Sequence, residues 1–274
     1  MDKLLVICGP TAIGKTALAA FLAKKFNGEL ISADSRQVYR GMDIVTGKDR
    51  PNVPIWLYDV VNPDEEFSVS HWVKLASDAI VNIQKRNKLP IVVGGTGLYI
   101  HALLNPLETI NIPPDSKLRT QLSILSKTQL QEKLQKIAPN IWKELNISER
   151  NNPRRLIRKI EINESKIDGN KQQNLFNYLM VGLTAPLTEL DQRIDKRFAK
   201  RVQQGMNDEI NILIKKYKQD LPSMSAIGLN EHAYARRQMT WFKKQAGIHW
   251  FTITKLGYKS DVTAEVSKWY TKVE

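Results

Sequence analysis

The chain opens with Leu4-Leu5-Val6-Ile7-Cys8-Gly9-Pro10-Thr11-Ala12-Ile13-Gly14-Lys15-Thr16, a short apolar run that ends in a glycine-bracketed turn. A helix-prone run, residues 17–26, follows at once, and residues 9–16 match the phosphate-loop pattern G-x-x-x-x-G-K-T in full. The glycines let successive backbone N–H groups turn toward one anion, and the following helix adds its positive dipole end. Lys15 supplies a full charge, and the Thr16 hydroxyl is a ligand for Mg²⁺. The order strand, loop, helix therefore predicts a polyphosphate site rather than an ordinary corner, without saying which polyphosphate binds.

Composition narrows the class of protein. The 274 residues suffice for one large domain or for a core with an insertion, and 42% of them are hydrophobic, as in a folded protein. No apolar run approaches the ~20 residues of a membrane span, and the first residues lack a signal-peptide layout, so we expect a cytoplasmic protein with no membrane partner. The single cysteine, Cys8, excludes an internal disulfide, and its position in the first strand predicts a small core residue.

The charge balance points to a large anionic partner. Lysines and arginines number 41 against 28 aspartates and glutamates, a formal net charge of +13. Small anionic substrates rarely need so broad a positive field, whereas a nucleic-acid backbone does. A simple bias toward solubility remains the alternative explanation.

The second predicted strand places a carboxylate at its end. Residues 28–34 form a short apolar run that finishes on Asp34. Loops at the carboxyl ends of strands line the ligand crevice in open α/β sheets, so Asp34 should lie beside the phosphate loop. A helix N-cap or an Asx-turn is an equally common use of an aspartate at such a position.

Two further strand-loop-helix units follow. Residues 55–61 are a third strand candidate. A Walker-B acid would lie at the end of such an apolar run, whereas Asp59 lies inside it. A helix with Ser68 or Ser70 as its cap precedes a buried strand at 89–93. Glycines and Thr96 follow that strand, where Thr96 would contact a ligand or cap the next helix. This alternation predicts an α/β fold, a parallel sheet flanked by helices.

The pattern then changes to a polar, helical one. A proline-punctuated exit near residues 105–114 leads into residues 115–173, which read as a small helical insertion domain closed by a turn at 168–170. Strand character returns at 176–183. We therefore predict a catalytic core formed by residues 1–110 and 175–274, with residues 111–174 as the insertion.

Basic residues concentrate in three places. Arg154 and Arg158 share one face of a predicted helix in the insertion. Arg193, Arg197 and Arg201 follow at i,i+4 spacing along the helical pattern of residues 186–218, facing an anion or forming a solvated, salt-bridged surface. Residues 236–244 combine four cations with two aromatic side chains, which suits a nucleic-acid strand, although the aromatics would equally pack on the core.

Taken in order, these motifs resemble the tRNA dimethylallyltransferase family, also called tRNA prenyl- or isopentenyltransferases. The resemblance covers almost the whole chain and rests on residues 9–16, Asp34-Ser35-Arg36-Gln37-Val38-Tyr39-Arg40-Gly41-Met42-Asp43-Ile44, Val93-Gly94-Gly95-Thr96-Gly97-Leu98-Tyr99, Asn152-Pro153-Arg154-Arg155, Ser225-Ala226-Ile227-Gly228 and Arg237-Gln238-Met239-Thr240-Trp241. The phosphate loop alone is shared by many enzymes, whereas the Asp-Ser-x-Gln-Val-Tyr loop with the Gly-Gly-Thr-Gly-Leu-Tyr turn is specific. The resemblance implies a P-loop NTPase-like core.

The resemblance also implies an activity. In that family the phosphate loop holds the pyrophosphate of dimethylallyl diphosphate instead of a nucleotide such as ATP. The five-carbon group passes to N6 of the adenosine immediately 3′ of the anticodon, in tRNAs that read codons beginning with U. The insertion domain grips the anticodon stem-loop, and the target base leaves its stack to enter a channel. We expect the enzyme to act as a monomer.

Residue roles carry over by the same resemblance. Asp34 becomes the general base that accepts the N6 proton. Lys15, Thr16 with Mg²⁺, and Arg193 neutralise the departing pyrophosphate. The residues implied to contact the target base, its neighbours or the rest of the tRNA are Asp34, Ser35, Arg36, Gln37, Thr96, Arg119, Arg154, Arg155, Leu156, Ile157 and Arg158.

Two departures and two rival functions complete the prediction. Val45 replaces a glycine that is usual in the family. Glu231 is followed almost directly by Tyr234, whereas the family has about one more helical hairpin at this place, so the helices expected to face tRNA are shortened.

The phosphate loop and the parallel sheet would also allow a P-loop kinase for a small metabolite. An RNA-binding regulatory NTPase would need a clear Walker-B acid, and only the interior Asp59 offers itself.

Overall fold

The structure, a computed structural model, describes residues 3–105, 109–110, 112–165, 176–227 and 230–272. The chain divides into two compact units, Met1–Asn105 with Asn174–Glu274, and Pro106–Gln173. Residues 111 and 166–175, which include the predicted turn at 168–170 and flank both predicted domain boundaries, lie outside the described residues. None of the described helices is both long enough and apolar enough to span a bilayer.

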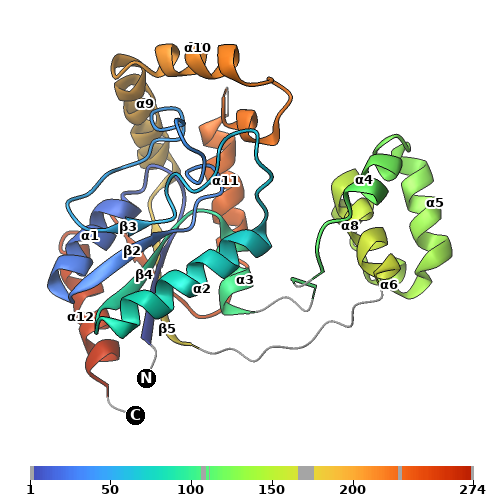
Figure 1. Ribbon diagram of the computed structural model, residues 1–274. Helices are drawn as coiled ribbons and strands as arrows, with labels where there is room; N and C mark the ends of the chain where they lie inside the picture. Colours follow the sequence, from blue (N-terminus) through green and yellow to red (C-terminus); the bar gives the residue numbers. More distant parts are fainter. Residues whose placement is uncertain (1–2, 106–108, 111, 166–175, 228–229, 273–274) are drawn as a thin grey trace. The chain divides into compact units, whose positions relative to one another are not determined.

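The first unit is built on a six-stranded parallel sheet (Figure 1). Its strands lie in the order β3-β2-β4-β1-β5-β6, and every neighbouring pair is parallel. The strands are β1 (Lys3–Cys8), β2 (Gly28–Ser32), β3 (Ile55–Trp56), β4 (Leu89–Gly94), β5 (Asn177–Thr184) and β6 (Ile248–Thr252). Parallel strands buried on both faces read as continuous apolar runs, and β1, buried from Leu4 to Cys8, is such a run.

Helices cover both faces of this sheet (Figure 1). The helices of this unit are α1 (Lys15–Lys25), α2 (Val69–Lys85), α3 (Gly97–Leu104), α9 (Leu187–Gln203), α10 (Met206–Lys216), α11 (Glu231–Phe242) and α12 (Tyr258–Thr271), with a short 3₁₀ turn at Pro222–Ala226. Leu5 and Ile7 of β1 pack in the cluster that contains α1 and α12, whereas Leu4 and Cys8 pack in the cluster that contains α2 and α3. This alternation along β1 is the two-residue period of a strand.

Positive φ angles explain two differences from the predicted elements. The strand predicted at residues 55–61 ends at Trp56, because Leu57 and Asp59 adopt φ angles of 68° and 58°. The helical pattern of residues 186–218 is two helices, α9 and α10, because Gly205 between them has a φ angle of 95°. Left-handed backbone of this kind ends a regular element. Strand β6 was not predicted.

The second unit is a small bundle of helices. Its elements are α4 (Ser116–Ser123), α5 (Lys127–Ile137), α6 (Pro139–Glu144), α7 (Ile147–Arg150) and α8 (Pro153–Glu164). A separate apolar cluster holds them together, centred on Leu130, Leu134, Leu156 and Ile160. Side-chain caps at Asp115, Ser126, Asn146 and Asn152 accept hydrogen bonds from the first turns of their helices, which is why the chain changes direction so often here.

A buried charge ties β2 to the end of α2. Glu29 is 2% exposed and accepts hydrogen bonds from Arg86 Nη1 and Nη2 at 2.5 and 2.8 Å, from Lys88 Nζ at 2.7 Å and from Trp56 Nε1 at 2.9 Å. The hydrogen bonds from Arg86, followed by those from Lys88 and Trp56, lower the pKa of Glu29 to about 2 despite its burial. The carboxylate is therefore stabilised in its charged form by the fold itself.

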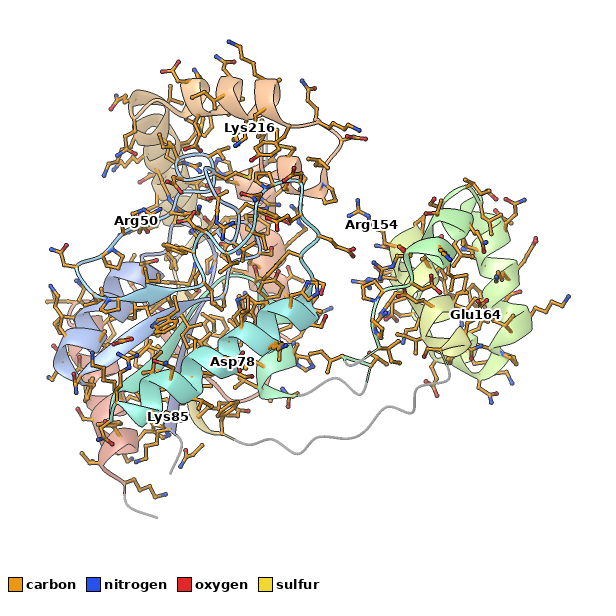
Figure 2. The ribbon with its side chains drawn as sticks, in the orientation of Figure 1. Arg50, Asp78, Lys85, Arg154, Glu164 and Lys216 are labelled. Atoms are coloured by element: carbon orange, nitrogen blue, oxygen red, sulfur yellow. The ribbon has the colours of Figure 1, made fainter. Side chains whose placement is uncertain are left out.

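The substitution Glu29→Gln is expected to lower the free energy of unfolding at pH 7 by about 2 kcal/mol, because it removes one partner of a buried, hydrogen-bonded pair. The folded-state pKa is depressed, so the stabilisation is complete above the ordinary pKa of a glutamate and is lost as the pH falls toward 2. Urea unfolding at pH 7 and at pH 3 measures this, and the difference between the two proteins should shrink at pH 3. Asp78→Asn, on the exposed face of α2 (Figure 2), is the control and should change stability little.

Candidate functional site

The loop between β1 and α1 has the backbone of an anion cradle. Gly9, Ala12 and Gly14 adopt φ angles of 142°, 61° and 94°, and α1 begins directly afterwards at Lys15. A side chain on Gly9 would place its Cβ 2.6 Å from the carbonyl oxygen of Leu183 on β5. The glycine is therefore required both by backbone conformation and by close approach of the next strand. The first residues of α1, Lys15 and Thr16, line the cavity described next, where the N-terminus of a helix favours an anion.

A glutamine from α11 braces this loop. The Thr11 backbone N–H donates to Gln238 Oε1 at 2.8 Å, and Gln238 Nε2 donates to the carbonyl oxygen of Gly95 at 2.9 Å. Gln238 is buried, and it bridges the phosphate loop and the turn that follows β4. The predicted Gly-Gly-Thr-Gly turn thus contributes to the geometry of the site through its backbone.

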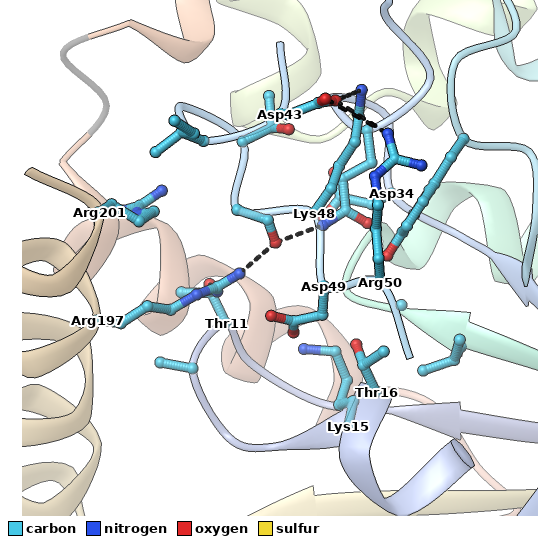
Figure 3. A pocket seen from close by; sticks show the side chains of 18 of the residues that line it. Thr11, Lys15, Thr16, Asp34, Asp43, Lys48, Asp49, Arg50, Arg197 and Arg201 are labelled. Atoms are coloured by element: carbon cyan, nitrogen blue, oxygen red, sulfur yellow. Dashed lines mark hydrogen bonds and ion pairs between the residues drawn. The ribbon is translucent and has the colours of Figure 1, made fainter. Parts of the chain in front are cut away.

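A cavity of about 760 Å³ opens above the phosphate loop (Figure 3). Its lining comes chiefly from the phosphate loop, the segment after β2, the loop of residues 43–50 and helix α9, with further residues from the end of β4 and from α11. Its charged lining residues are Lys15, Asp34, Asp43, Lys48, Asp49, Arg50, Arg197, Lys200 and Arg201. The cations outnumber the acids by six to three, which favours an anionic ligand.

Asp34 serves both of the uses considered for it. Its Oδ1 accepts a hydrogen bond of 3.0 Å from the Arg36 backbone N–H, which is an Asx-turn. Its carboxylate also lines the cavity together with Lys15 and Thr16. Thr96 holds the same turn from the other side, since its hydroxyl accepts a hydrogen bond of 3.0 Å from the Ser35 N–H. The turn therefore aims a partly buried carboxylate at the cavity from a rigid strand end.

The residues that follow Asp34 are engaged with neighbouring segments. Gln37 Nε2 donates to the carbonyl oxygen of Gly47 at 3.2 Å, and Gln37 Oε1 accepts from the Ser32 hydroxyl at 3.1 Å. The Arg36 guanidinium lies over the ring of Tyr234 on α11, 4.7 Å from its centroid. Tyr234 precedes the basic segment of residues 236–244 and was not predicted as a site residue.

Helix α9 brings a different arginine to the cavity from the one predicted. Arg193 forms an ion pair with Glu189 at 2.7 Å on the same helix, and the α9 arginines that line the cavity are Arg197 and Arg201, one and two turns further on. Arg197 Nη1 donates to the Thr11 hydroxyl at 3.0 Å and Nη2 donates to the Gly47 carbonyl at 2.6 Å (Figure 3). The i,i+4 spacing identified the helix face correctly, but not which turn of it reaches the phosphate loop.

Crowding of like charges prepares the cavity for an anion. Burial, and then the charge of Arg197, lower the pKa of Lys15 to about 8. The same two causes lower the pKa of Arg201 to about 10. Arg201 is almost fully buried, where it donates to the Val45 carbonyl and pairs with Glu231. A bound anion would offset the repulsion among these cations. The reduction in unfavourable electrostatic energy would contribute to the free energy of anion binding.

The affinity of the protein for inorganic diphosphate is expected to fall as the pH rises through about 8, because Lys15 loses its proton there. The bound anion stabilises the charged form of Lys15. The affinity therefore decreases over the pH range in which Lys15 loses its proton in the unliganded protein. Calorimetric titrations between pH 6.5 and 9.5 measure it. In Lys15→Arg, whose guanidinium keeps its charge across this range, the decline near pH 8 should disappear, and an equal decline in both proteins would assign it to another group.

A buried ion-pair network shapes the loop above the phosphate loop. The side chain of Lys48 is fully buried, with its Nζ 2.8 Å from Asp43, 2.5 Å from Asp59 and 2.6 Å from the Tyr39 carbonyl. Arg50 pairs with Asp59 as well, at 2.8 Å. Asp59 is therefore neutralised within this network rather than free to act as a Walker-B acid.

Helix α10 holds the same loop from outside. Glu209 accepts hydrogen bonds from three successive backbone N–H groups, those of Asp43, Ile44 and Val45, at 3.1, 2.9 and 2.8 Å. Val45 stands where the resemblance leads one to expect glycine, and its side chain is buried. No local pattern in the sequence indicated that Glu209 pairs with a segment more than 160 residues away.

The helical unit divides the predicted RNA-contacting residues into two groups. Glu161, 2% exposed, pairs with Arg119 at 2.9 Å and with Arg158 at 2.5 Å, so these arginines hold the bundle together. Leu156 is fully buried in the apolar cluster and Ile157 packs against it, so both side chains contribute to the core of the bundle, and their contact with tRNA stays a prediction. The helical period explains this, since the chain from Arg154 to Arg158 makes more than one turn. Arg154 and Arg155 are exposed.

The segment at residues 236–244 proves to be part of the core fold. Phe242 is fully buried, and Trp241 packs against it edge to face with ring centroids 5.1 Å apart. A Cβ on Gly97 would meet the Trp241 ring. The aromatics therefore pack α11 onto α3, which was the alternative to base stacking. His232, near the start of α11, lies 2.7 Å from Asp191 and 2.9 Å from Asp195 on α9.

Comparisons with known proteins agree with this architecture. The family model described as IPP transferase matches residues 37–233. A tRNA dimethylallyltransferase from Halothermothrix orenii is 36% identical over 306 residues, covering 97% of this chain and 92% of that protein. The solved tRNA isopentenylpyrophosphate transferase from Bacillus halodurans has a TM-score of 0.69 and 32% identity, over 98% of each chain. A structure of a eukaryotic dimethylallyltransferase acting on tRNA has a TM-score of 0.83 and 27% identity, covering 98% of this chain and 79% of that one.

The length of the first of these alignments is informative. It runs to 306 residues, whereas this chain has 274, so the relative contains segments that this chain lacks. The family match spans well over half of the chain and includes the loop after β2, the helical unit and α9. The chain therefore belongs to the IPP transferase family, the tRNA dimethylallyltransferases, and is a prenyl-transferring enzyme on a P-loop NTPase-like core.

Proposed function

We propose that this enzyme transfers the dimethylallyl group from dimethylallyl diphosphate to N6 of the adenosine on the 3′ side of the anticodon, in tRNAs that read codons beginning with U. A bond forms between N6 and the allylic carbon, and the bond from that carbon to the diphosphate oxygen breaks. The electron pair leaves with the diphosphate, and the N6 proton passes to a base. The observation that carries the proposal is that one cavity holds both an anion cradle and the carboxylate of Asp34.

Asp34 is the base in this proposal. The exocyclic amine of adenine is a weak nucleophile, so removal of its proton during attack lowers the barrier. One carboxylate oxygen is held by the Arg36 N–H at 3.0 Å, which fixes the orientation of the group. The Thr96 hydroxyl, bonded to the Ser35 N–H, fixes the turn that presents it.

The phosphate loop, Lys15 and Arg197 hold the leaving group. Negative charge grows on the diphosphate as the carbon–oxygen bond breaks, and fixed cations and N–H dipoles stabilise that charge without rearrangement. We assign to Arg197 the role that the resemblance gave to Arg193, because Arg197 contacts both Thr11 and Gly47 at the cavity. Arg201 adds a second, buried charge behind it.

A divalent cation, Mg²⁺, fits the same place. Mg²⁺ is commonly held by one or two carboxylates together with substrate phosphates and water. Among the described residues, no three histidine, cysteine or acidic side chains are arranged to bind a metal, so the diphosphate would have to supply ligands. The hydroxyl of Thr16 lines the cavity and is the ligand that the phosphate-loop motif predicts. When bound there, the cation would offset charge on the diphosphate.

The helical unit is proposed to bind the anticodon stem-loop. Arg154 and Arg155 are exposed at the start of α8, and Figure 2 shows Arg154 projecting away from the other helices of that unit. Arg119 and Arg158, by contrast, are paired with the buried Glu161 and support the bundle. We therefore assign direct contact with RNA phosphates to Arg154 and Arg155.

The substitution Arg154→Ala is expected to weaken stem-loop binding and to reduce the slope of log affinity against log salt by about one, as for one lost phosphate contact. Filter binding at 50–300 mM salt measures the slope. Arg150→Ala is the comparison, since Arg150 donates to the Trp142 carbonyl and stacks on that ring within the bundle. An unchanged slope in Arg154→Ala would show that this arginine does not contact a phosphate.

The test of the reaction uses labelled dimethylallyl diphosphate, ATP and an anticodon stem-loop with adjacent adenosines. Label that moves to the RNA without ATP supports prenyl transfer. Phosphoryl transfer from ATP, with no label on the RNA, would support the small-metabolite kinase instead. The kinase leaves the basic helical unit without a function, and the membership of the IPP transferase family favours prenyl transfer.

A further inference from the structure

One carboxylate in the cavity lacks an explanation in the proposed reaction. Asp49 lies in the loop of residues 43–50 and lines the cavity beside the phosphate loop. In the view of Figure 3 its carboxylate lies next to the Lys15 ammonium group, with Thr16 on the other side of that lysine. Among the described residues, Asp49 has no hydrogen-bond or ion-pair partner for its carboxylate.

The other acidic side chains of the cavity are already engaged. Asp43 pairs with Lys48 at 2.8 Å, and Asp59, just behind it, pairs with Lys48 and Arg50. Asp34 accepts a hydrogen bond from Arg36 N–H and is the proposed base. The neighbouring strand β4 ends at Gly94, which Gly95 follows, and so brings no carboxylate to the phosphate loop.

A free carboxylate at this position is unfavourable for an anion site by itself. A diphosphate held by the phosphate loop would be repelled by a carboxylate that shares the cavity floor with Lys15. A divalent cation between the two reverses the sign of that interaction. In phosphate-loop enzymes the cation rests on the loop's Ser or Thr hydroxyl and on an acidic side chain from another segment. Thr16 supplies the hydroxyl here, and Asp49 is the carboxylate that faces the same part of the cavity.

We propose that Asp49 is the acidic ligand of the divalent cation that accompanies the diphosphate, acting together with the Thr16 hydroxyl. The inference rests on the proposed binding of a diphosphate at residues 9–16. In this arrangement the carboxylate ligand of the cation comes from the loop of residues 43–50, whereas a Walker-B acid comes from the end of a strand. The buried Lys48 network and Glu209 hold that loop in place, so the carboxylate is presented by a fixed segment.

The experiment compares Asp49→Asn with the original chain in calorimetric titrations with inorganic diphosphate, with Mg²⁺ present and with EDTA. With Mg²⁺, the variant should bind diphosphate about tenfold more weakly, because a cation ligand is lost. With EDTA, the variant should bind diphosphate more tightly than the original chain, because a repelling charge has been removed. The effect of the substitution therefore changes sign with the metal. Binding of Mn²⁺ in the presence of diphosphate, followed by electron paramagnetic resonance, should weaken in parallel.

Two further variants sharpen the comparison. Asp49→Glu keeps the charge and should retain part of the Mg²⁺ dependence, whereas Asp78→Asn, exposed on α2, should behave as the original chain does. Thermal melting shows whether each variant is folded. Tighter diphosphate binding by Asp49→Asn both with and without Mg²⁺, or an unchanged response to Mg²⁺, would overturn the proposal.

These titrations need neither RNA nor a prenyl group. Failure of prenyl transfer with intact, Asp49-dependent Mg²⁺ binding would therefore count against the proposed reaction alone. A normal prenyl-transfer reaction together with an unaltered Mg²⁺ dependence in Asp49→Asn would count against this inference alone.

Discussion

Replacing Asp34 by asparagine is expected to lower the turnover of prenyl transfer by about 10²–10⁴-fold, the range for loss of a positioned general base, while stem-loop affinity stays near that of the original enzyme. Asparagine has nearly the same size as aspartate and keeps an oxygen that accepts the Arg36 N–H, so the turn after β2 should persist. What is lost is the ability to take the N6 proton. The substitution separates the chemical role of the residue from its structural one.

Single-turnover rates with a saturating stem-loop measure the chemical step, and filter binding measures affinity. Asp34→Glu serves as the companion variant, because it restores a base in a displaced position and should recover part of the rate. A large loss of stem-loop affinity with Asp34→Asn would instead make the residue structural or base-reading.

Replacing Arg197 by alanine is expected to lower the rate of prenyl transfer by about 10²–10³-fold, as for removal of one donor that stabilises developing negative charge. Arg197 reaches the Thr11 hydroxyl and the Gly47 carbonyl from α9, at the edge of the cavity where the diphosphate is proposed to lie. Its removal also relieves the repulsion that lowers the pKa of Lys15, which recovers part of the ground-state cost.

Arg193→Ala is the matched control on the same helix. Arg193 is half-exposed and paired with Glu189 at 2.7 Å, and such surface pairs contribute little. We expect its rate to stay within about twofold of the original. Inhibition by inorganic diphosphate, measured for both variants, tests binding of the leaving group. A larger effect from Arg193→Ala than from Arg197→Ala would contradict the assignment.

Local patterns predicted the catalytic end of the sheet well. The phosphate loop, the strands at 28–34 and 89–93 and the glycine turn after them are each encoded by consecutive residues, because their backbone conformations depend on glycines and on apolar runs. The edge strand β6 escaped prediction for a related reason. Its burial is only partial, so the sequence Ile248–Thr252 shows no continuous apolar run.

The insertion shows where such patterns fail. Arg154, Leu156 and Arg158 lie within one basic stretch, and the sequence led to the same prediction of tRNA contact for all three. The fold gives them three different environments: Arg154 is exposed, Leu156 is buried and Arg158 pairs with Glu161. These environments depend on the packing of α8 against α4 and α5, and no residue within the stretch reports it.

Residues close together in the chain thus specified the phosphate loop, the parallel α/β order and the family's motifs, since these need only neighbouring φ angles and hydrophobic periods. The choice of Arg197 over Arg193, the placement of Asp49 beside Thr16 and the use of Glu209 to hold the loop of residues 43–50 came from the packed molecule. Each joins segments that are tens to more than a hundred residues apart. Their contacts depend on how helices and loops rest on the sheet, and a one-dimensional pattern carries no record of that arrangement.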